Sequence, residues 1–230
     1  MDQMGAQAFQ EIKSNVKSDA DPRVIQYVNC VVTPLTQAAK NQTSVSQWEV
    51  VVFKSPDVNA FALPGGRIGV YSGLLNVAKS DAQLAAVVGH EIGHVIAHHG
   101  AERVSQQAGT QLGLAALGAI SGNNPQSKTL MGLLGVGVQV GVLLPFSRTQ
   151  ENEADLVGLD LMARAGFDPH ESVALWKNMI EASGNKAPAE WLSTHPASEN
   201  RISNLESHMT DADAKYKLAR SEGRTPKCQK

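Results

Sequence analysis

The fold is organised around Val87-Val88-Gly89-His90-Glu91-Ile92-Gly93-His94-Val95-Ile96-Ala97-His98-His99. This stretch places a His-Glu-x-x-His motif inside an apolar helical run. His90 and His94 are four residues apart, so on a helix both imidazoles project from one face and can reach one metal ion. Glu91 points to the side, where it can hold a water without ligating the metal. A chance match in a core helix would not explain these ionisable groups, since burying them unpaired is costly. The stretch therefore predicts a zinc-binding helix.

The composition is that of an ordinary soluble globular chain. It has 230 residues, 42% of them hydrophobic and 18% charged, and a net charge of −2. With no basic excess, we expect no nucleic-acid partner. We expect a single domain over 1–230, with N-terminal helices in 1–45, a core in 46–210 and a C-terminal tail in 211–230.

Two cysteines, Cys30 and Cys228, match neither a zinc-finger nor a redox spacing. They are either free thiols or one disulfide that ties the tail to an early helix, and the sequence alone does not choose. The chain opens without a basic-then-apolar signal segment. Either the protein is cytosolic, or its numbering begins after a removed signal or lipid-attachment region.

Local signals in the first half predict helices, then strands. A polar amphipathic helix is expected over 4–17, and a second begins at Asp21-Pro22 and is kinked or cut short at Pro34. Three β-rich runs then predict a small antiparallel sheet with one exposed edge. These runs are Trp48–Phe53, Val58–Leu63 and Arg67–Tyr71, with a turn at Pro64-Gly65-Gly66.

The second half reads as helices. A short helix is expected over 72–78, and a capping box from Ser80 to Gln83 begins the long helix, which runs at least to His99. The Gly- and Leu-rich segment 112–146 predicts a packed helical hairpin, with a role as a mobile lid left open. Helices are also expected over 147–165, from Asp168 to 182 and over 198–208, with a loop around 187–194 and a loose tail over 221–230.

A catalytic zinc site needs a third protein ligand, and Glu151 can supply it. Glu151 and Asp155 are four residues apart on one helical face, whereas Glu153 lies about 200° round the helix from Glu151. If Glu151 binds zinc, Asp155 can hold the outer ring nitrogen of a zinc histidine and fix its tautomer. Taken alone, Glu151 and Asp155 could simply be solvent-exposed acidic residues in the first turn of a helix. Together with His90 and His94, they are better explained as a zinc ligand and its supporting carboxylate.

With these residues in place, the chain resembles the gluzincin zinc metallopeptidases of the HtpX, BepA and LoiP kind, the CaaX prenyl-protease type. It lacks the long spanning helices and the helical repeats of some members and is most similar to the compact, stand-alone envelope members. The matching pieces follow the family's order. They are 58–68 (Val-Asn-Ala-Phe-Ala-Leu-Pro-Gly-Gly-Arg-Ile), His90–His94, Ser147-Arg148 with 151–155, His195-Pro196 and Arg201.

The resemblance implies a mainly helical α+β fold, zincin-like, whose small antiparallel sheet packs against the His-Glu-x-x-His helix. It implies one Zn²⁺ per chain, held by His90, His94 and Glu151, with a water activated by zinc and Glu91. Peptide binding is implied along the strand before the Gly-Gly turn. The substrate residues on that strand are Asn59, Ala60, Phe61 and Ala62.

By the same resemblance, the substrates are unfolded or misassembled envelope proteins, and membrane or outer-membrane assembly machinery is a candidate partner. The location implied is the periplasm or cell envelope, with anchorage through a removed N-terminal segment as one option. That location favours a disulfide between Cys30 and Cys228. The alternative function is a chaperone or assembly factor that binds unfolded partners with little proteolysis.

His195 and Arg201 are the candidates for a second donor to the oxyanion, on their chain position and the resemblance. His195 has a competing interpretation, in which its imidazole occupies the open zinc position and holds the enzyme inactive. The two interpretations predict opposite effects of removing the side chain. His98 and His99 lie one or more helical turns beyond His94 and are expected at the surface or behind the ligands.

Overall fold

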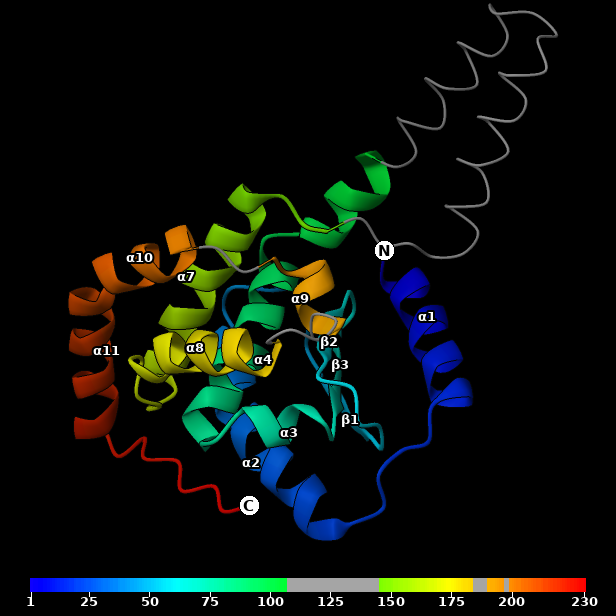
Figure 1. Ribbon diagram of the computed structural model, residues 1–230, viewed down its shortest axis with the longest axis horizontal. Helices are drawn as coiled ribbons and strands as arrows, with labels where there is room; N and C mark the ends of the chain where they lie inside the picture. Colours follow the sequence, from blue (N-terminus) through cyan, green and yellow to red (C-terminus); the bar gives the residue numbers. More distant parts are fainter. Residues whose placement is uncertain (107–144, 184–189, 197–198) are drawn as a thin grey trace, which may run out of the picture.

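The computed structural model describes residues 1–106, 145–183, 190–196 and 199–230, and it is mainly helical with one small sheet. The central helix, α4 (Asp81–Ile96), lies between the sheet and a group of helices (Figure 1). Every residue of α4 from Ala82 to His94 is buried, as its apolar sequence predicts. The Ser80 hydroxyl accepts a hydrogen bond from the Gln83 amide at 3.1 Å, so the helix begins where the predicted capping box places it.

Helix α7 (Arg148–Arg164) packs against α4 at a backbone distance that only glycine permits. A Cβ atom built on Gly158 would lie 2.7 Å from the backbone nitrogen of His90, and one on Gly93 would lie 2.8 Å from the carbonyl oxygen of Ala154. Larger residues at these positions would force the two helices apart. The close contact brings the first turns of α7 beside the His-Glu-x-x-His motif.

The sheet has three strands, β1 (Glu49–Phe53), β2 (Ala60–Leu63) and β3 (Arg67–Tyr71), in the order β1-β3-β2. β2 and β3 form the predicted antiparallel hairpin, and its turn uses Gly65 and Gly66 with φ of 82° and 81°. β2 also packs against α4. The expected packing of the sheet on the motif helix is therefore confirmed.

The prediction of a wholly antiparallel sheet is wrong, because β1 pairs with β3 in parallel. The β-branched pattern of β1 identifies a strand but says nothing about the direction of its neighbour. β2 occupies one side of β3, so β1 takes the other side, and residues 54–59 carry the chain across to the far edge. Residues 17–19 bond to the outer side of β1 at Val52 and Lys54, which leaves the outer edge of β2 as the edge that no described strand pairs with.

Two N-terminal helices flank the sheet and α4 (Figure 1). α2 (Pro22–Ala39) has a buried apolar face and continues through Pro34 to Ala39, so this proline does not cut the helix short. α1 (Asp2–Asn15) buries Phe9 against the rings of Phe53 and Phe61. A Cβ on Gly5 would lie 2.3 Å from the Pro64 carbonyl oxygen, so α1 rests directly on the hairpin turn.

Several of the remaining helices lie on the other side of α4 from the sheet, whereas α9 lies close to β2 (Figure 1). One of them, α9, forms where the sequence predicted a loop, and another, α11, forms where it predicted part of the tail. The bounds are α3 (Leu74–Val77), α8 (Glu171–Ser183), α9 (Glu190–Thr194), α10 (Glu199–Ser207) and α11 (Met209–Ser221).

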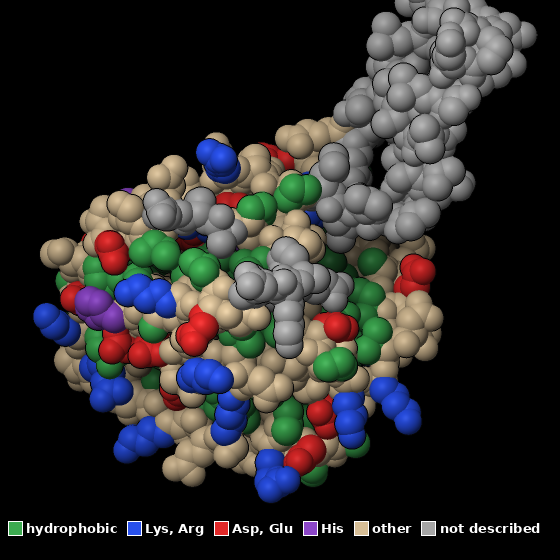
Figure 2. Space-filling model, in the orientation of Figure 1, with side chains coloured by type: hydrophobic (Ala, Val, Ile, Leu, Met, Phe, Trp, Pro, Cys, Tyr) green, Lys and Arg blue, Asp and Glu red, His purple; other side chains and the backbone are tan. Residues whose placement is uncertain are grey.

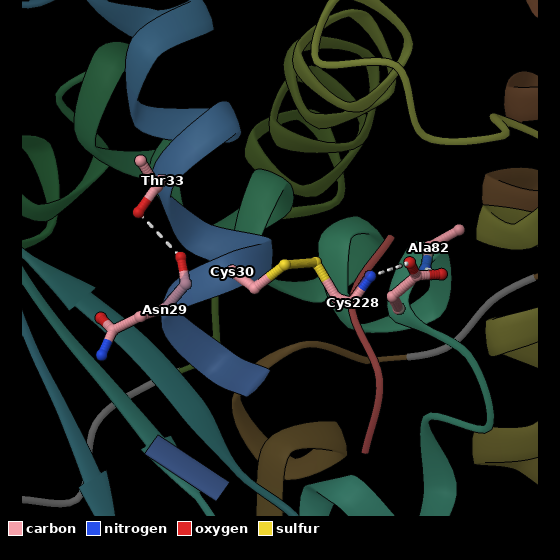
Figure 3. Close-up of a disulfide and its surroundings, with 6 residues drawn as sticks. Asn29, Cys30, Thr33, Ala82 and Cys228 are labelled. Atoms are coloured by element: carbon pink, nitrogen blue, oxygen red, sulfur yellow. Dashed lines mark hydrogen bonds between the residues drawn. A yellow bond between two sulfur atoms is a disulfide. The ribbon is translucent and has the colours of Figure 1, made fainter. Parts of the chain in front are cut away.

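The C-terminal segment after α11 is attached to the body of the protein, which corrects the expectation of a loose tail. Cys228 forms a disulfide with Cys30 of α2 (Figure 3). The Cys228 amide donates to the Asp81 carboxylate at 3.3 Å, and the Lys230 ammonium donates to the carbonyls of Leu75 and Ala78 at the end of α3. Composition identified the segment as polar, but a covalent bond and these contacts fix its position.

Charged side chains of both signs are mixed on the face in view in Figure 2, where Lys and Arg lie along the lower rim with Asp and Glu among them. A mixed surface fits the near-zero net charge. Among the described residues, no helix combines the length and the apolar character that crossing a membrane would require.

Candidate metal centre

Helix α4 presents His90, Glu91 and His94, but it ends earlier than predicted. The helix stops at Ile96, His98 takes a left-handed conformation with φ of 58°, and a new helical segment runs over 99–106. A left-handed residue at a helix end changes the direction of the chain. His99 therefore returns toward His94, and the two Nδ1 atoms lie 2.9 Å apart.

Helix α7 presents Glu151 and Asp155 on the face that contacts α4. The predicted capping box is complete, since Ser147 accepts from the Gln150 amide and Gln150 accepts from the Ser147 amide. This fixes the helix start, so Glu151 falls in the first turn and is 1% exposed. The Glu153 side chain, expected on another face, is 58% exposed.

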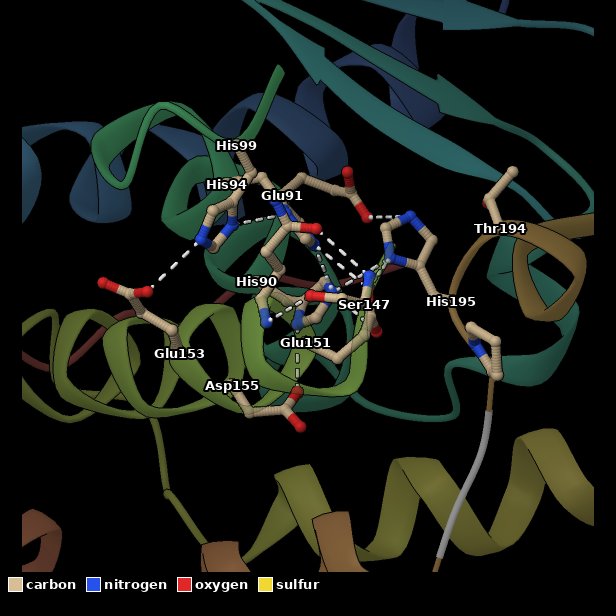
Figure 4. Close-up of polar contacts among 12 residues, drawn as sticks. His90, Glu91, His94, His99, Ser147, Glu151, Glu153, Asp155, Thr194 and His195 are labelled. Atoms are coloured by element: carbon tan, nitrogen blue, oxygen red, sulfur yellow. Dashed lines mark hydrogen bonds and ion pairs between the residues drawn. The ribbon is translucent and has the colours of Figure 1, made fainter. Parts of the chain in front are cut away.

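Four buried side chains, those of His90, His94, Glu151 and His195, converge so that one ligand atom from each lies within 4.8 Å of the others (Figure 4). His90 Nε2 lies 3.0 Å from His94 Nε2 and 3.2 Å from His195 Nδ1. His195 Nδ1 lies 2.9 Å from Glu151 Oε1. The structure thus brings together the three predicted ligands and places His195 in a fourth position.

The spacing of these atoms fits a tetrahedral metal site. Nitrogen lone pairs that face one another repel unless a proton or a cation lies between them. In a site with bonds of about 2.0–2.1 Å, neighbouring ligand atoms are about 3.3–3.4 Å apart. Glu151 Oε1 lies 3.4 Å from His94 Nε2, and the other carboxylate oxygen, Oε2, lies 3.7 Å from His90 Nε2. A set of imidazoles and a carboxylate suits zinc and related transition metals.

The site's electrostatics favour the protonation states that bind a metal. Burial lowers the pKa of His90 well below its usual range and that of His94 to about 4, so both imidazoles are neutral at pH 7. Burial opposes ionisation of Glu151, but hydrogen bonds from His195 and His94 prevail and lower its pKa. Neutral imidazoles and an ionised carboxylate are the forms that bind metal ions.

Asp155 lies directly behind His90, where the sequence predicted it. Its carboxylate accepts from His90 Nδ1 at 2.9 Å and from Arg201 Nε and Nη2 at 2.6 and 2.7 Å. Arg201 is 2% exposed, pairs also with Glu151 and stacks on Trp176 at 3.9 Å. These contacts place Arg201 behind His90, in hydrogen-bond contact with Asp155 and paired with Glu151.

Glu91 does not join the cluster and is held beside it. Its Oε1 accepts from the indole Nε1 of Trp191 at 2.7 Å and lies 3.5 Å from His195 Nε2. Burial raises the pKa of the Glu91 carboxyl, because a low-dielectric surrounding disfavours its charged form. The Trp191 ring stacks on His195 at 4.8 Å. No motif pointed to Trp191, because it meets Glu91 only in three dimensions.

A cleft of about 870 Å³ lies beside the cluster, and Glu91, His94 and His195 form part of its wall. The residues predicted to bind substrate, Asn59, Ala60, Phe61 and Ala62, line the same cleft. They belong to β2 or directly precede it, so the unpaired strand edge and the site share one cleft. Residues of α1 also line it, a contribution that the sequence did not indicate.

Phe146 and Arg103 line the cleft as well, and sequence reasoning missed both. The Phe146 ring stacks on His94 with centroids 3.9 Å apart, and the Arg103 guanidinium lies 3.7 Å from the Phe146 centroid. Arg103 Nε and Nη2 are buried, and no described residue is a hydrogen-bond partner of either atom. The predicted hairpin over 112–146 and its possible lid role fall, except for Pro145 and Phe146, outside the described residues.

Comparison with known proteins gives a consistent match. The model of peptidase family M48 matches residues 22–209. The mitochondrial metalloendopeptidase OMA1 of Schizosaccharomyces pombe is 34% identical over 90% of this chain, and OMA1 of Bos taurus is 36% identical over 86%. The β-barrel assembly-enhancing protease of Escherichia coli is 29% identical over 87%. The chain spans 61%, 39% and 42% of the lengths of these three relatives.

Proposed function

The chain belongs to peptidase family M48, and from this premise we propose that it is a zinc-dependent endopeptidase that cleaves unfolded or misassembled proteins. The observation that carries the proposal is the buried cluster of three imidazoles and one carboxylate beside Glu91. Relatives named as metalloendopeptidases support the same class of reaction. His90, His94 and Glu151 would hold the ion, with Asp155 orienting His90.

When bound, zinc supplies a Lewis acid that polarises the scissile carbonyl and makes water easier to deprotonate. Side chains of the protein carry out the proton transfers and hold the reacting groups in position. Glu91 takes the proton from the attacking water and passes it to the leaving amine. Trp191 holds the Glu91 carboxylate in place through its indole N–H. Arg103 lines the cleft, whereas Arg201 is buried and does not, so Arg103 is the better candidate to contact a substrate oxygen.

The open edge of β2 supports binding of substrate as an added strand, because main-chain hydrogen bonds give affinity with little sequence preference. Ala60 and Ala62 would make these bonds, because the Asn59 carbonyl already accepts from the Tyr71 amide and Phe61 pairs with Gly69 of β3. We propose an oxidising envelope compartment, such as the periplasm, because the Cys30–Cys228 disulfide fits one. A relative named for enhancing β-barrel assembly makes outer-membrane assembly machinery the proposed partner.

The test is cleavage of unfolded casein by the purified chain with chelator and with zinc added back. The proposal expects cleavage that chelator stops and stoichiometric zinc restores. Cleavage that persists after complete removal of metal would refute a metallopeptidase. If the protein is instead a chaperone that binds unfolded partners with little proteolysis, casein should be bound and kept soluble but remain intact, with or without metal.

We further propose that His195 fills the position that a catalytic zinc site leaves open for water. His195 Nδ1 lies with the three other ligand atoms, and its stacking on Trp191 couples it to α9. The expected result of His195→Ala is faster basal cleavage of casein with zinc content unchanged. If His195 instead donates to the oxyanion, kcat falls by about 10²-fold or more. His208→Ala, at an exposed histidine between α10 and α11, is the control.

A further inference from the structure

His99 is a buried histidine whose position the motif does not explain. The side chain of His99 is 2% exposed, and its Nδ1 lies 2.9 Å from Nδ1 of His94. Its other ring nitrogen, Nε2, lies 3.3 Å from the Glu153 carboxylate (Figure 4). His99 thus stands between a proposed metal ligand and a largely exposed acidic group.

The chemistry of His94 fixes the direction of these two hydrogen bonds. If His94 binds zinc through Nε2, its neutral ring carries the remaining proton on Nδ1 and must donate it. His99 Nδ1 is then the acceptor, so the His99 proton sits on Nε2 and is donated to Glu153. Each of the two hydrogen bonds then has one donor and one acceptor, and the second bond ends on the Glu153 carboxylate.

The arrangement repeats what Asp155 does for His90 on the other side of the cluster. The rear nitrogen of His90 has a carboxylate partner at 2.9 Å, and the rear nitrogen of His94 has an imidazole partner at the same distance. The left-handed conformation of His98, uncommon for a residue other than glycine, is what returns His99 to this position. Packing alone would not require a polar ring here.

Resting on the proposed zinc site, we propose that His99 is a positioning residue that holds His94 in the Nδ1–H tautomer and relays that bond to Glu153. Outer partners of metal-bound histidines are worth about 10- to 100-fold in metal affinity. We therefore expect His99→Ala to weaken zinc binding by about that factor. His99→Asn, whose side-chain oxygen can stand where Nδ1 stood, should bind within a few-fold of the wild type.

The measurement is zinc affinity by competition with a chromophoric chelator, beside thermal unfolding of the metal-free proteins to confirm folding. His208→Ala makes the same chemical change at an exposed histidine and should bind zinc like the wild type. A folded His99→Ala with wild-type affinity would overturn the proposal, as would His99→Asn as weak as His99→Ala. Failure of the wild type itself to bind zinc would instead refute the site.

A second measurement needs no variant. In the zinc-loaded wild type labelled with ¹⁵N-histidine, the nitrogen shifts of His99 should report a proton on Nε2 and none on Nδ1. A proton on His99 Nδ1, or on both nitrogens, would overturn the proposed direction of the hydrogen bonds from His94 through His99 to Glu153, even if zinc binds normally.

Discussion

Glu91→Gln is expected to lower kcat for unfolded casein by about 10²- to 10⁴-fold, the usual contribution of a general base. The amide cannot take a proton from water, yet its oxygen can still accept from the Trp191 indole, which is 2.7 Å from Glu91 Oε1. The fold and the four converging ligand atoms should therefore be unchanged. The measurement is kcat with zinc content determined on the same sample.

The same variant separates the two functions. A peptidase loses its action on substrate proteins, whereas a chaperone keeps its ability to hold casein soluble and to support assembly in cells. Glu102→Gln, a conversion of the same kind at an exposed residue near the cleft, is the control. Wild-type turnover by a folded, zinc-loaded Glu91→Gln protein would remove Glu91 from the reaction.

Glu151→Gln is expected to lose bound zinc, with a fall in affinity larger than the roughly 100-fold that an outer partner can account for. Glu151 is buried with its Oε1 2.9 Å from His195 Nδ1 and 3.4 Å from His94 Nε2. A neutral amide oxygen there is a weaker ligand and leaves the ion's charge less compensated. Metal analysis after gel filtration measures the effect.

Glu153→Gln is the matched control, two residues along the same helix. Its side chain is 58% exposed, and Gln can still accept from His99 Nε2. We expect full zinc content. Loss of zinc from Glu153→Gln with retention by Glu151→Gln would mean that the helix presents the other carboxylate to the metal.

The parts of the site that follow local periodicity could be predicted from the sequence. His90 and His94 share a helical face at a spacing of four residues, and so do Glu151 and Asp155. Helical geometry alone places each pair. That the two pairs meet depends on Gly93 and Gly158, whose missing side chains let α4 and α7 approach, and no periodicity reveals that contact.

Features that depend on distant parts of the chain escaped prediction. The partner and direction of β1 depend on where β2 already lies, and Trp191 reaches Glu91 across 100 residues. The break at His98 had no glycine to mark it, so the apolar pattern extended the helix to His99. Arg103 contacts Phe146, which lies far from it in the sequence, and neither residue belongs to a recognisable motif.

The Cys30–Cys228 bond encloses nearly the whole chain, since the two cysteines are 198 residues apart. A proteolytic enzyme's own molecules are its nearest substrates, and any single cut between these cysteines leaves two fragments that are still joined through sulfur. A nicked molecule would therefore run as one species on a non-reducing gel and separate into two pieces only after thiol treatment. Self-digestion at one point would thus not by itself release either piece of the enzyme.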